Sequence, residues 1–248
     1  MRPIVPAIAL LLSFALAACT GPQQRDEEEY EEADFHYQLA QGYFQNGEVP
    51  FAIRELQLTL EVIPDHVGAL YLLGFIYQGR MDYPMAESYY EAALDVFPGR
   101  FDIRNNLGSV YLAQSRWADA EDTFRALTRE PTYSTPGHAH NNLGWALYEQ
   151  GRTREAIDQF EMALMFQPDL CLAWNNAGLA WAEMGNAIEA RHYLQNAVDR
   201  CNDYAEPRYR LAQLLIATGG DPADAVELFE ECVELGSEWA RRCAEYLP

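Results

Sequence analysis

The feature that most constrains the fold is a pattern of small and large residues that recurs about every 34 residues. When units begin at residues 33, 67, 101, 137, 171 and 205, the eighth position of each unit is small: Ala40, Gly74, Gly108, Gly144, Gly178 and Ala212. The twentieth position of the first five units is alanine: Ala52, Ala86, Ala120, Ala156 and Ala190. In a helical hairpin, small residues mark the points where two helices cross most closely. The pattern therefore predicts six two-helix units.

Large residues and prolines complete the pattern. Aromatic or leucine side chains recur at the eleventh position and near the twenty-fourth, where they fill the space that the small residues leave. Pro64, Pro98 and Pro168 are expected to end the second helix of their units, because proline interrupts a helix and restricts the residue before it. This combination is typical of tetratricopeptide repeats. We therefore predict an all-α chain whose helix hairpins form a right-handed superhelical solenoid.

The expected units span about residues 33–66, 67–100, 101–136, 137–170, 171–204 and 205–236. Two places depart from the regular spacing. The linker Glu130–Pro136 between units three and four is longer than the others and holds two prolines and a tyrosine, and unit six has one extra residue near Gly219–Pro222. Residues 237–248 are expected to form a helix that caps the last hairpin, because solenoids need a polar end.

The first eighteen residues have the features of an export signal. Arg2 supplies the positive start, residues 4–15 are apolar, and small residues precede Cys19. The apolar run is too short to span a bilayer. Residues 16–19 resemble the bacterial lipobox, which implies cleavage before Cys19 and acylation of its sulfur; an ordinary signal peptide with an unrelated cysteine is the alternative.

Acyl chains on Cys19 would anchor the protein to a membrane. In the proteins that this N-terminus resembles, Thr20 in place of aspartate favours the outer membrane, so we expect a lipid-anchored protein on its periplasmic face. Residues 19–32 include the acidic run QQRDEEEYEE and are expected to form a tether. Alternatively, the end of this run forms the acidic first turn of the first helix.

The net charge of the chain disfavours polyanionic partners. The chain has 17 basic residues, all arginine, against 38 acidic ones, so its net charge of −21 disfavours nucleic acid and bare anionic lipid.

An exported chain can form disulfides. We expect Cys171 to pair with Cys201, because the second helix of a hairpin returns to the end where the first begins, and Cys232 to pair with Cys243 on the capping helix. For each pair the alternative is free, buried thiols.

The first helix of each hairpin is expected to line the inner groove of the superhelix. The candidate partner-binding residues there are six aromatics and three amides: Tyr37, Phe44, Tyr71, Phe75, Trp145, Tyr148, Asn105, Asn141 and Asn175. Amides hydrogen-bond the main chain of a bound peptide, and aromatic rings accept apolar anchors. The alternative is that these side chains are solvated or packed between adjacent hairpins.

The sequence offers no catalytic constellation. It contains no glycine-rich phosphate loop, and His138 and His140 diverge at the start of a helix without further ligands of metal-binding spacing nearby. The sequence also shows no catalytic nucleophile paired with a base and no set of converging carboxylates. We therefore expect no enzyme, metal, cofactor or small-molecule substrate.

The segment Phe124–Pro136, followed by Ala139–Gly144, resembles the corresponding junction in the type IV pilus pilotins, the biogenesis and stability lipoproteins of the PilF, PilW and Tgl type. The resemblance covers nearly the whole mature chain, and its specific parts are this junction and the lipobox. It implies a non-catalytic outer-membrane lipoprotein that binds secretin subunits, and other pilus or envelope components, and promotes secretin localisation and multimerisation. The alternative is a general envelope scaffold that recruits a protease or a cell-wall enzyme.

Overall fold

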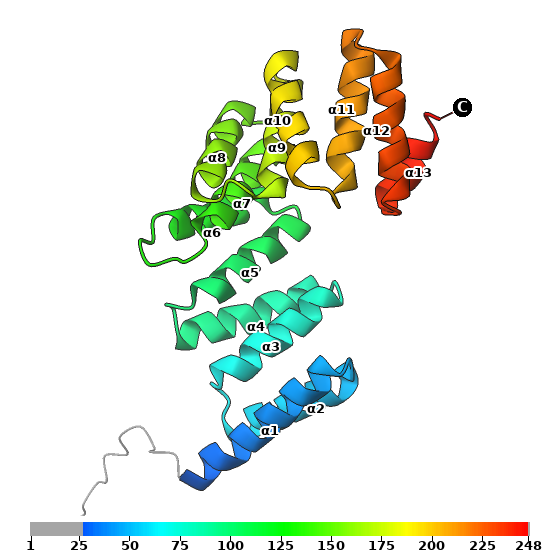
Figure 1. Cartoon of the computed structure of the whole chain (residues 1–248). Helices are drawn as coiled ribbons and strands as arrows, with labels where there is room; N and C mark the ends of the chain where they lie inside the picture. Colours follow the sequence, from blue (N-terminus) through cyan, green and yellow to red (C-terminus); the bar gives the residue numbers. More distant parts are fainter. Residues whose placement is uncertain (1–26, 248) are drawn as a thin grey trace, which may run out of the picture.

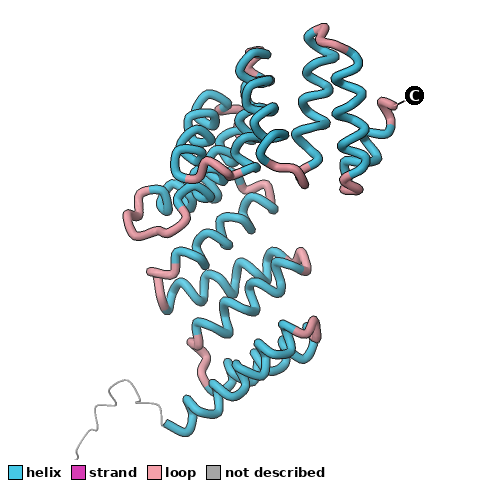
Figure 2. The backbone as a smooth tube through the Cα atoms, viewed as in Figure 1, coloured by secondary structure: helices cyan, strands magenta, loops and turns pink. Residues whose placement is uncertain are grey.

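The computed structural model describes residues 27–247, which form thirteen α-helices and no strand. Figure 1 shows that the helices pair into antiparallel hairpins, stacked into a curved array with α1 at one end and α13 at the other. Figure 2 shows the loops, in pink, that join one helix to the next. In chain order the helices are α1 Glu27–Gln45, α2 Val49–Val62, α3 Val67–Gly79, α4 Tyr83–Val96, α5 Phe101–Ala113, α6 Trp117–Thr128, α7 Pro136–Glu149, α8 Thr153–Phe166, α9 Cys171–Glu183, α10 Ala187–Arg200, α11 Ala205–Thr218, α12 Pro222–Glu234 and α13 Glu238–Ala244.

Steric fit between small and large residues holds each hairpin together. A Cβ atom added to Gly108 of α5 would lie 2.7 Å from the ring of Phe124 on α6, and one added to Gly144 of α7 would lie 2.6 Å from Phe160 on α8. Both phenylalanine side chains are completely buried. The repeating small positions are therefore close-contact points, and the predicted all-helical repeat fold is confirmed.

The odd-numbered helices α1 to α11 line the inner side of the array. Neighbours in this set touch one another directly, α3 with α5, α5 with α7, α7 with α9 and α9 with α11, whereas successive second helices make no contacts of similar extent. The inner side of a curved stack is the shorter side, so helices are closest there. The first helices thus form the wall of the groove.

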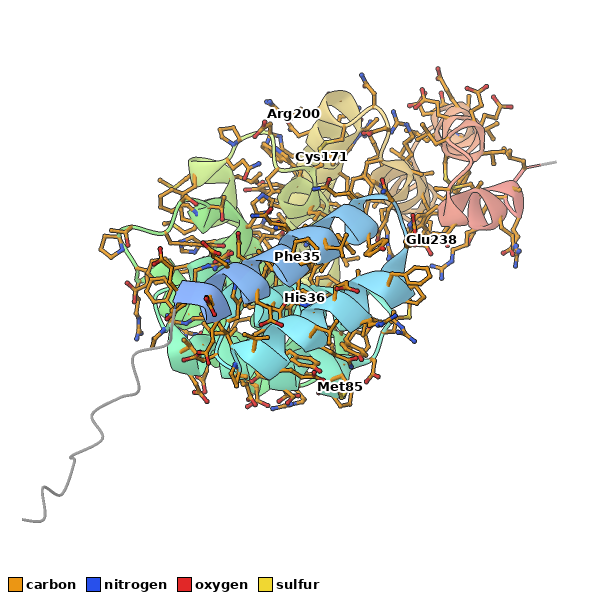
Figure 3. All side chains as sticks on the ribbon, turned by 90° about the horizontal axis from the view of Figure 1, so that it is seen from below. Phe35, His36, Met85, Cys171, Arg200 and Glu238 are labelled. Atoms are coloured by element: carbon orange, nitrogen blue, oxygen red, sulfur yellow. A yellow bond between two sulfur atoms is a disulfide. The ribbon has the colours of Figure 1, made fainter. Side chains whose placement is uncertain are left out.

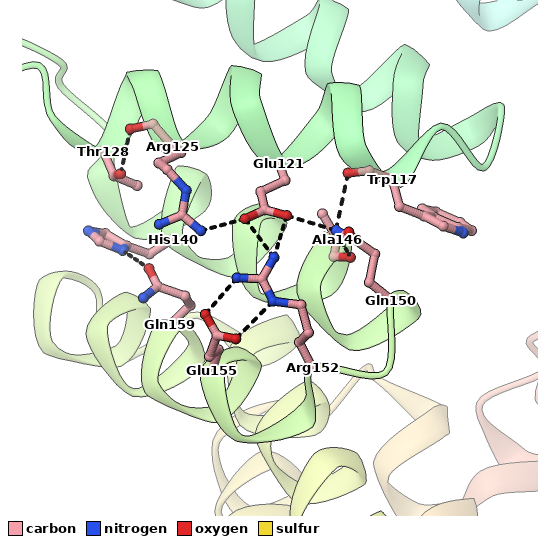
Figure 4. Close-up of polar contacts among 10 residues, drawn as sticks. All are labelled: Trp117, Glu121, Arg125, Thr128, His140, Ala146, Gln150, Arg152, Glu155 and Gln159. Atoms are coloured by element: carbon pink, nitrogen blue, oxygen red, sulfur yellow. Dashed lines mark hydrogen bonds and ion pairs between the residues drawn. The ribbon is translucent and has the colours of Figure 1, made fainter.

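Two clusters of ion pairs and hydrogen bonds on the side of the second helices join unit two to unit three and unit three to unit four. We call each cluster a polar clamp. The Glu121 carboxylate of α6 accepts hydrogen bonds from Arg125 of its own helix, from Arg152 at 2.7 and 2.8 Å, and from Gln150 at 2.9 Å (Figure 4). Glu87 accepts from Arg116 in the equivalent place, at 2.7 and 2.8 Å. Units one and four carry isoleucine at this position and unit five carries arginine, so within residues 27–247 these two junctions alone have the clamp.

Both ends differ from the sequence prediction. Residues 27–32, expected in the tether, belong to α1, because the partial positive charge of a helix N-terminus favours the carboxylates of its first turn, Glu27, Glu28 and Glu29. Figure 3 looks onto this end, where Phe35 of α1 is exposed. The capping helix is shorter than expected, ending at Ala244 instead of continuing to the C-terminus. The signal peptide, Cys19 and residues 19–26 of the tether lie outside the described residues.

Two disulfides reinforce the C-terminal half. Cys171 at the start of α9 is bonded to Cys201 just after α10, beside Arg200 (Figure 3), with Cα atoms 6.0 Å apart. Cys232 of α12 is bonded to Cys243 of α13, with Cα atoms 6.2 Å apart. The second bond fastens the capping helix over the last hairpin. Across residues 27–247, every helix is too short or too polar to traverse a bilayer.

Candidate functional site

Three aromatic side chains form a continuous row on the inner wall of units one and two. Phe44 of α1 meets Phe75 of α3 edge to face, with ring centroids 5.9 Å apart, and Tyr71 of α3 follows 6.4 Å from Phe75. Phe75 is 45% exposed although it is apolar. We call these three residues the aromatic row; it offers partly exposed apolar surface to a protein partner.

Tyr37 packs at the edge of this row. Its ring lies 4.7 Å from that of His66, and a Cβ atom added to Gly68 would be 2.8 Å from its ring. Burial raises the pKa of the Tyr37 hydroxyl, which accepts a hydrogen bond from Gln41. Tyr37 thus contributes to the contact between units one and two and keeps part of its surface open.

The long linker between α6 and α7 forms one side of an open pocket beside the aromatic row. The hydroxyl of Tyr133 donates to Oδ1 of Asn105 over 3.3 Å, and its ring meets Phe101 edge to face at 6.2 Å. The resulting cavity of about 480 Å³, here named the junction pocket, has these lining residues: Tyr71, Gly99, Arg100, Phe101, Asp102, Asn105, Asn106, Thr132, Tyr133, Ser134 and Thr135. Predicted groove residues Tyr71 and Asn105 come together here.

The junction pocket holds one internal ion pair. Arg100 donates two hydrogen bonds to Asp102, at 2.8 and 2.6 Å, and its guanidinium lies 5.4 Å from the centre of the Tyr71 ring. These hydrogen bonds hold the pKa of the Asp102 carboxyl below its usual range. The pair leaves the pocket nearly neutral, with amide and hydroxyl groups as its main polar surface.

Two of the three predicted groove asparagines are buried instead of presented. Asn141 and Asn175 are only 4% and 2% exposed. Asn176 of α9 donates to Oδ1 of Asn141 on α7 over 3.0 Å, and this hydrogen bond links the two neighbouring inner helices. Contrary to the expectation that they line the groove, Asn141 and Asn175 therefore offer almost no accessible surface to a partner. Asn105 is half-buried. Its Oδ1 accepts a hydrogen bond from Tyr133 of the linker, whereas that of Asn141 accepts one from the next inner helix.

Trp145 and Tyr148 stack on α7 farther along the inner wall. Their ring centroids are 5.4 Å apart with an interplanar angle of 28°, and both side chains are half-buried. Burial, followed by a hydrogen bond to Glu183 of α9, raises the pKa of the Tyr148 hydroxyl. This pair and the aromatic row provide two separate aromatic surfaces in the same groove.

Sequence reasoning did not place Arg100, Asn106 or Tyr133 in the site. Tyr133 was visible as the aromatic residue of an unusually long linker, but a linker residue has no position in the repeat register. Asn106 donates to the Tyr71 hydroxyl over 3.4 Å and so supports the wall of the pocket. Its place one residue after Asn105 was the available signal.

Models of the tetratricopeptide repeat match residues 71–135, 137–170 and 208–235. The chain is a tetratricopeptide-repeat protein. It is homologous to the type IV pilus assembly protein PilF of Pseudomonas aeruginosa, with 26% identity over 195 residues that cover 75% of this chain and 76% of that protein. Family membership and this homology identify a non-enzymatic protein-interaction adaptor.

Two solved tetratricopeptide-repeat structures share the fold. The crystal structure of PilW, described as a widely conserved type IV pilus biogenesis factor, superimposes with a TM-score of 0.75 at 22% identity and covers 86% of this chain and 98% of PilW. The structure of PilF from Pseudomonas aeruginosa has a TM-score of 0.72 at 20% identity, covering 88% of this chain and 99% of PilF. The agreement extends over nearly the full length of both relatives.

Proposed function

We propose that this protein is a type IV pilus biogenesis factor that acts as a pilotin. In this role an acylated Cys19 anchors it to the periplasmic face of the outer membrane, while the inner groove binds a secretin subunit and promotes secretin multimerisation there. The single observation that carries the proposal is homology to PilF across three quarters of the chain. The partly exposed aromatic row on the inner wall supports the binding part of the proposal.

The proposed mechanism is an increase in effective concentration. A lipid anchor confines the protein to the membrane surface, and a groove-bound subunit is then confined with it. Secretin subunits held beside one another at their destination meet far more often than free subunits do. The protein needs no catalytic group for this role, because binding and tethering alone change the rate of assembly.

The test is deletion of the gene, followed by separation of outer-membrane fractions on gels that preserve secretin multimers. We expect multimers to be lost and monomers to accumulate in the inner membrane. Cys19→Ala should have the same effect by removing the anchor. Intact outer-membrane multimers in the deletion strain contradict the proposal.

The role of the groove is tested with Phe75→Ala. This variant removes the exposed centre of the aromatic row and is expected to weaken secretin capture about tenfold or more, since a truncated binding hot spot typically costs 2 kcal/mol or more. The matched control is Phe166→Ala, because Phe166 is the last residue of α8 in unit four and is similarly exposed. Equal loss of capture in both variants would show that the row is not the binding surface.

A further inference from the structure

A histidine caps the first helix of unit two. His66 precedes α3, and its Nδ1 accepts a hydrogen bond from the backbone N–H of Ala69 over 3.0 Å. Because a backbone N–H can only donate, Nδ1 carries the lone pair and the proton of the neutral ring lies on Nε2. The other inner helices α5, α7, α9 and α11 have no side-chain cap. The cap is therefore a special feature of unit two and not part of the repeat pattern.

The capping ring also forms part of the contact between units one and two. Its centroid lies 4.7 Å from that of the Tyr37 ring of α1, and both side chains are half-buried. Gly68 leaves room for this packing, because a Cβ atom there would lie 2.8 Å from the Tyr37 ring and 3.1 Å from the His66 ring. One side chain thus links the backbone of α3 to a ring of α1. We call Tyr37, His66 and Ala69 the histidine joint.

Protonation of His66 converts the capping acceptor into a donor. An imidazolium carries N–H groups on both nitrogens, so Nδ1–H would face the N–H of Ala69 at hydrogen-bond distance. The added charge would also lie at the N-terminus of α3, where the helix itself carries a partial positive charge. The Ala69 N–H keeps another acceptor, the carbonyl oxygen of His66 at 3.0 Å, so the ring can leave while the helix remains. Both effects move a charged ring away from the joint.

The charges around the ring oppose these effects, and burial supports them. Asp34 of α1 and Asp65 of the linker before α3 favour the imidazolium, and they are the charged groups that act on the ring in the described part of the chain. Burial favours the neutral ring more strongly and lowers the pKa of His66 from 6.5. Burial also raises the pKa of the Tyr37 hydroxyl, so this group stays uncharged at neutral pH. The neutral ring is therefore the form that fits the joint.

The aromatic row crosses the same junction. Phe44 lies on α1, whereas Tyr71 and Phe75 lie on α3, the helix that His66 caps. The ring centroids of Phe44 and Phe75 are 5.9 Å apart, so their contact depends on how α1 packs against α3. A change in the histidine joint therefore reaches the aromatic row through these two helices.

We propose that the histidine joint is a pH-sensitive device, in which neutral His66 fixes α1 against the start of α3 and its protonation loosens unit one and the aromatic row. The inference goes beyond the proposed function, because it concerns the protein alone and does not depend on which partner occupies the groove. Since the pKa of His66 is lower in the folded state, its contribution to stability is complete above about pH 6.5 and is lost as the pH falls through the folded-state value.

The test compares the wild type with two variants of the same residue. His66→Asn keeps a capping acceptor without a titrating group, whereas His66→Ala has no cap at any pH. Hydrogen exchange of amides in α1 and in the first turn of α3 is measured near pH 7.5 and near pH 5 on residues 19–248 and expressed as protection factors. We expect the wild type to match His66→Asn near pH 7.5 and His66→Ala near pH 5, with a fall in protection of about fivefold, as for the loss of one helix cap.

The matched control is His192→Asn, because His192 is exposed on the outer helix α10. This variant should keep the pH response of the wild type. A direct measurement is NMR titration of the ring protons, with the His66 signal assigned from its absence in His66→Asn. We expect His66 to titrate below pH 6.5 and the amide shift of Ala69 to follow the same curve.

Three results would overturn the proposal. The first is equal protection of the wild type and His66→Asn near pH 5, and the second is loss of the pH response in His192→Asn as complete as in His66→Asn. The third is an Ala69 amide shift that does not follow the titration of the ring. The comparison with His66→Asn and the NMR titration decide the question even if His66→Ala does not fold.

Discussion

Replacing Glu121 by glutamine tests whether the central clamp holds adjacent repeats together. The carboxylate is 13% exposed and lies between Arg125 and Arg152 (Figure 4). Burial alone would raise its pKa, but the hydrogen bonds from Arg125, Gln150 and Arg152 outweigh burial and lower the pKa from 4.5 to about 2. The glutamine variant keeps the shape of the side chain and removes the charge that these donors prefer.

The magnitude follows from the pKa and from the exposure of the partners. A pKa of about 2 in place of 4.5 corresponds to at most about 3 kcal/mol of folding stability. The two arginine side chains are 35% and 36% exposed, so water screens much of this interaction. We therefore expect Glu121→Gln to lower the free energy of unfolding by about 1–2 kcal/mol at neutral pH.

The dependence on pH has a definite sign. Because the pKa of Glu121 is lower in the folded state, its contribution is complete above about pH 4.5 and disappears as the pH falls toward 2. Urea unfolding followed by circular dichroism at pH 7, 4.5 and 3 measures the difference between wild type and variant. Hydrogen exchange of amides in α6 and α8 shows whether the loss is local, as expected for a repeat array.

Glu155→Gln is the matched control, because Glu155 binds the same Arg152 from a more exposed position, with 55% of its side chain accessible. It should leave the unfolding midpoint almost unchanged. The reasoning is refuted if Glu155→Gln costs as much stability as Glu121→Gln, or if the effect of Glu121→Gln is the same at pH 7 and pH 3.

Three further predictions concern the fold. Ser115 has a backbone φ of 58°, so Ser115→Gly should raise the free energy of unfolding by about 1 kcal/mol in urea titrations, whereas a loss would exclude strain there. Gly108→Ala should lower it by about 1–3 kcal/mol in the same titrations, because the new methyl group meets the Phe124 ring, and an unchanged midpoint would show that the ring can move. Replacing Cys232 and Cys243 together by serine should remove about 2–3 kcal/mol and speed hydrogen exchange in α13, while unchanged protection would show that packing alone holds the capping helix.

Short-range steric rules made the repeat fold predictable. Gly108 and Phe124 lie sixteen residues apart in one hairpin, and their sizes are complementary wherever the chain folds back on itself. Proline positions likewise act locally and set the ends of the second helices. The beginning of α1 was less predictable, because an acidic run suits both a solvated tether and a helix N-terminus.

The site was predictable in outline only. Asn105 and Asn141 occupy the same repeat position, yet Asn105 faces the linker residue Tyr133 whereas Asn141 is covered by Asn176 of the next inner helix. Nothing in the repeat register distinguishes them. The difference depends on how closely each pair of inner helices approaches.

The sequence by itself determined the number and type of the repeats, because helix crossing depends on side-chain volume at a fixed spacing. Tertiary structure alone decided which repeat positions are open to a partner. Exposure depends on contacts between residues about 35 positions apart and on where a non-repeating linker packs. The junction pocket arises from such contacts between units.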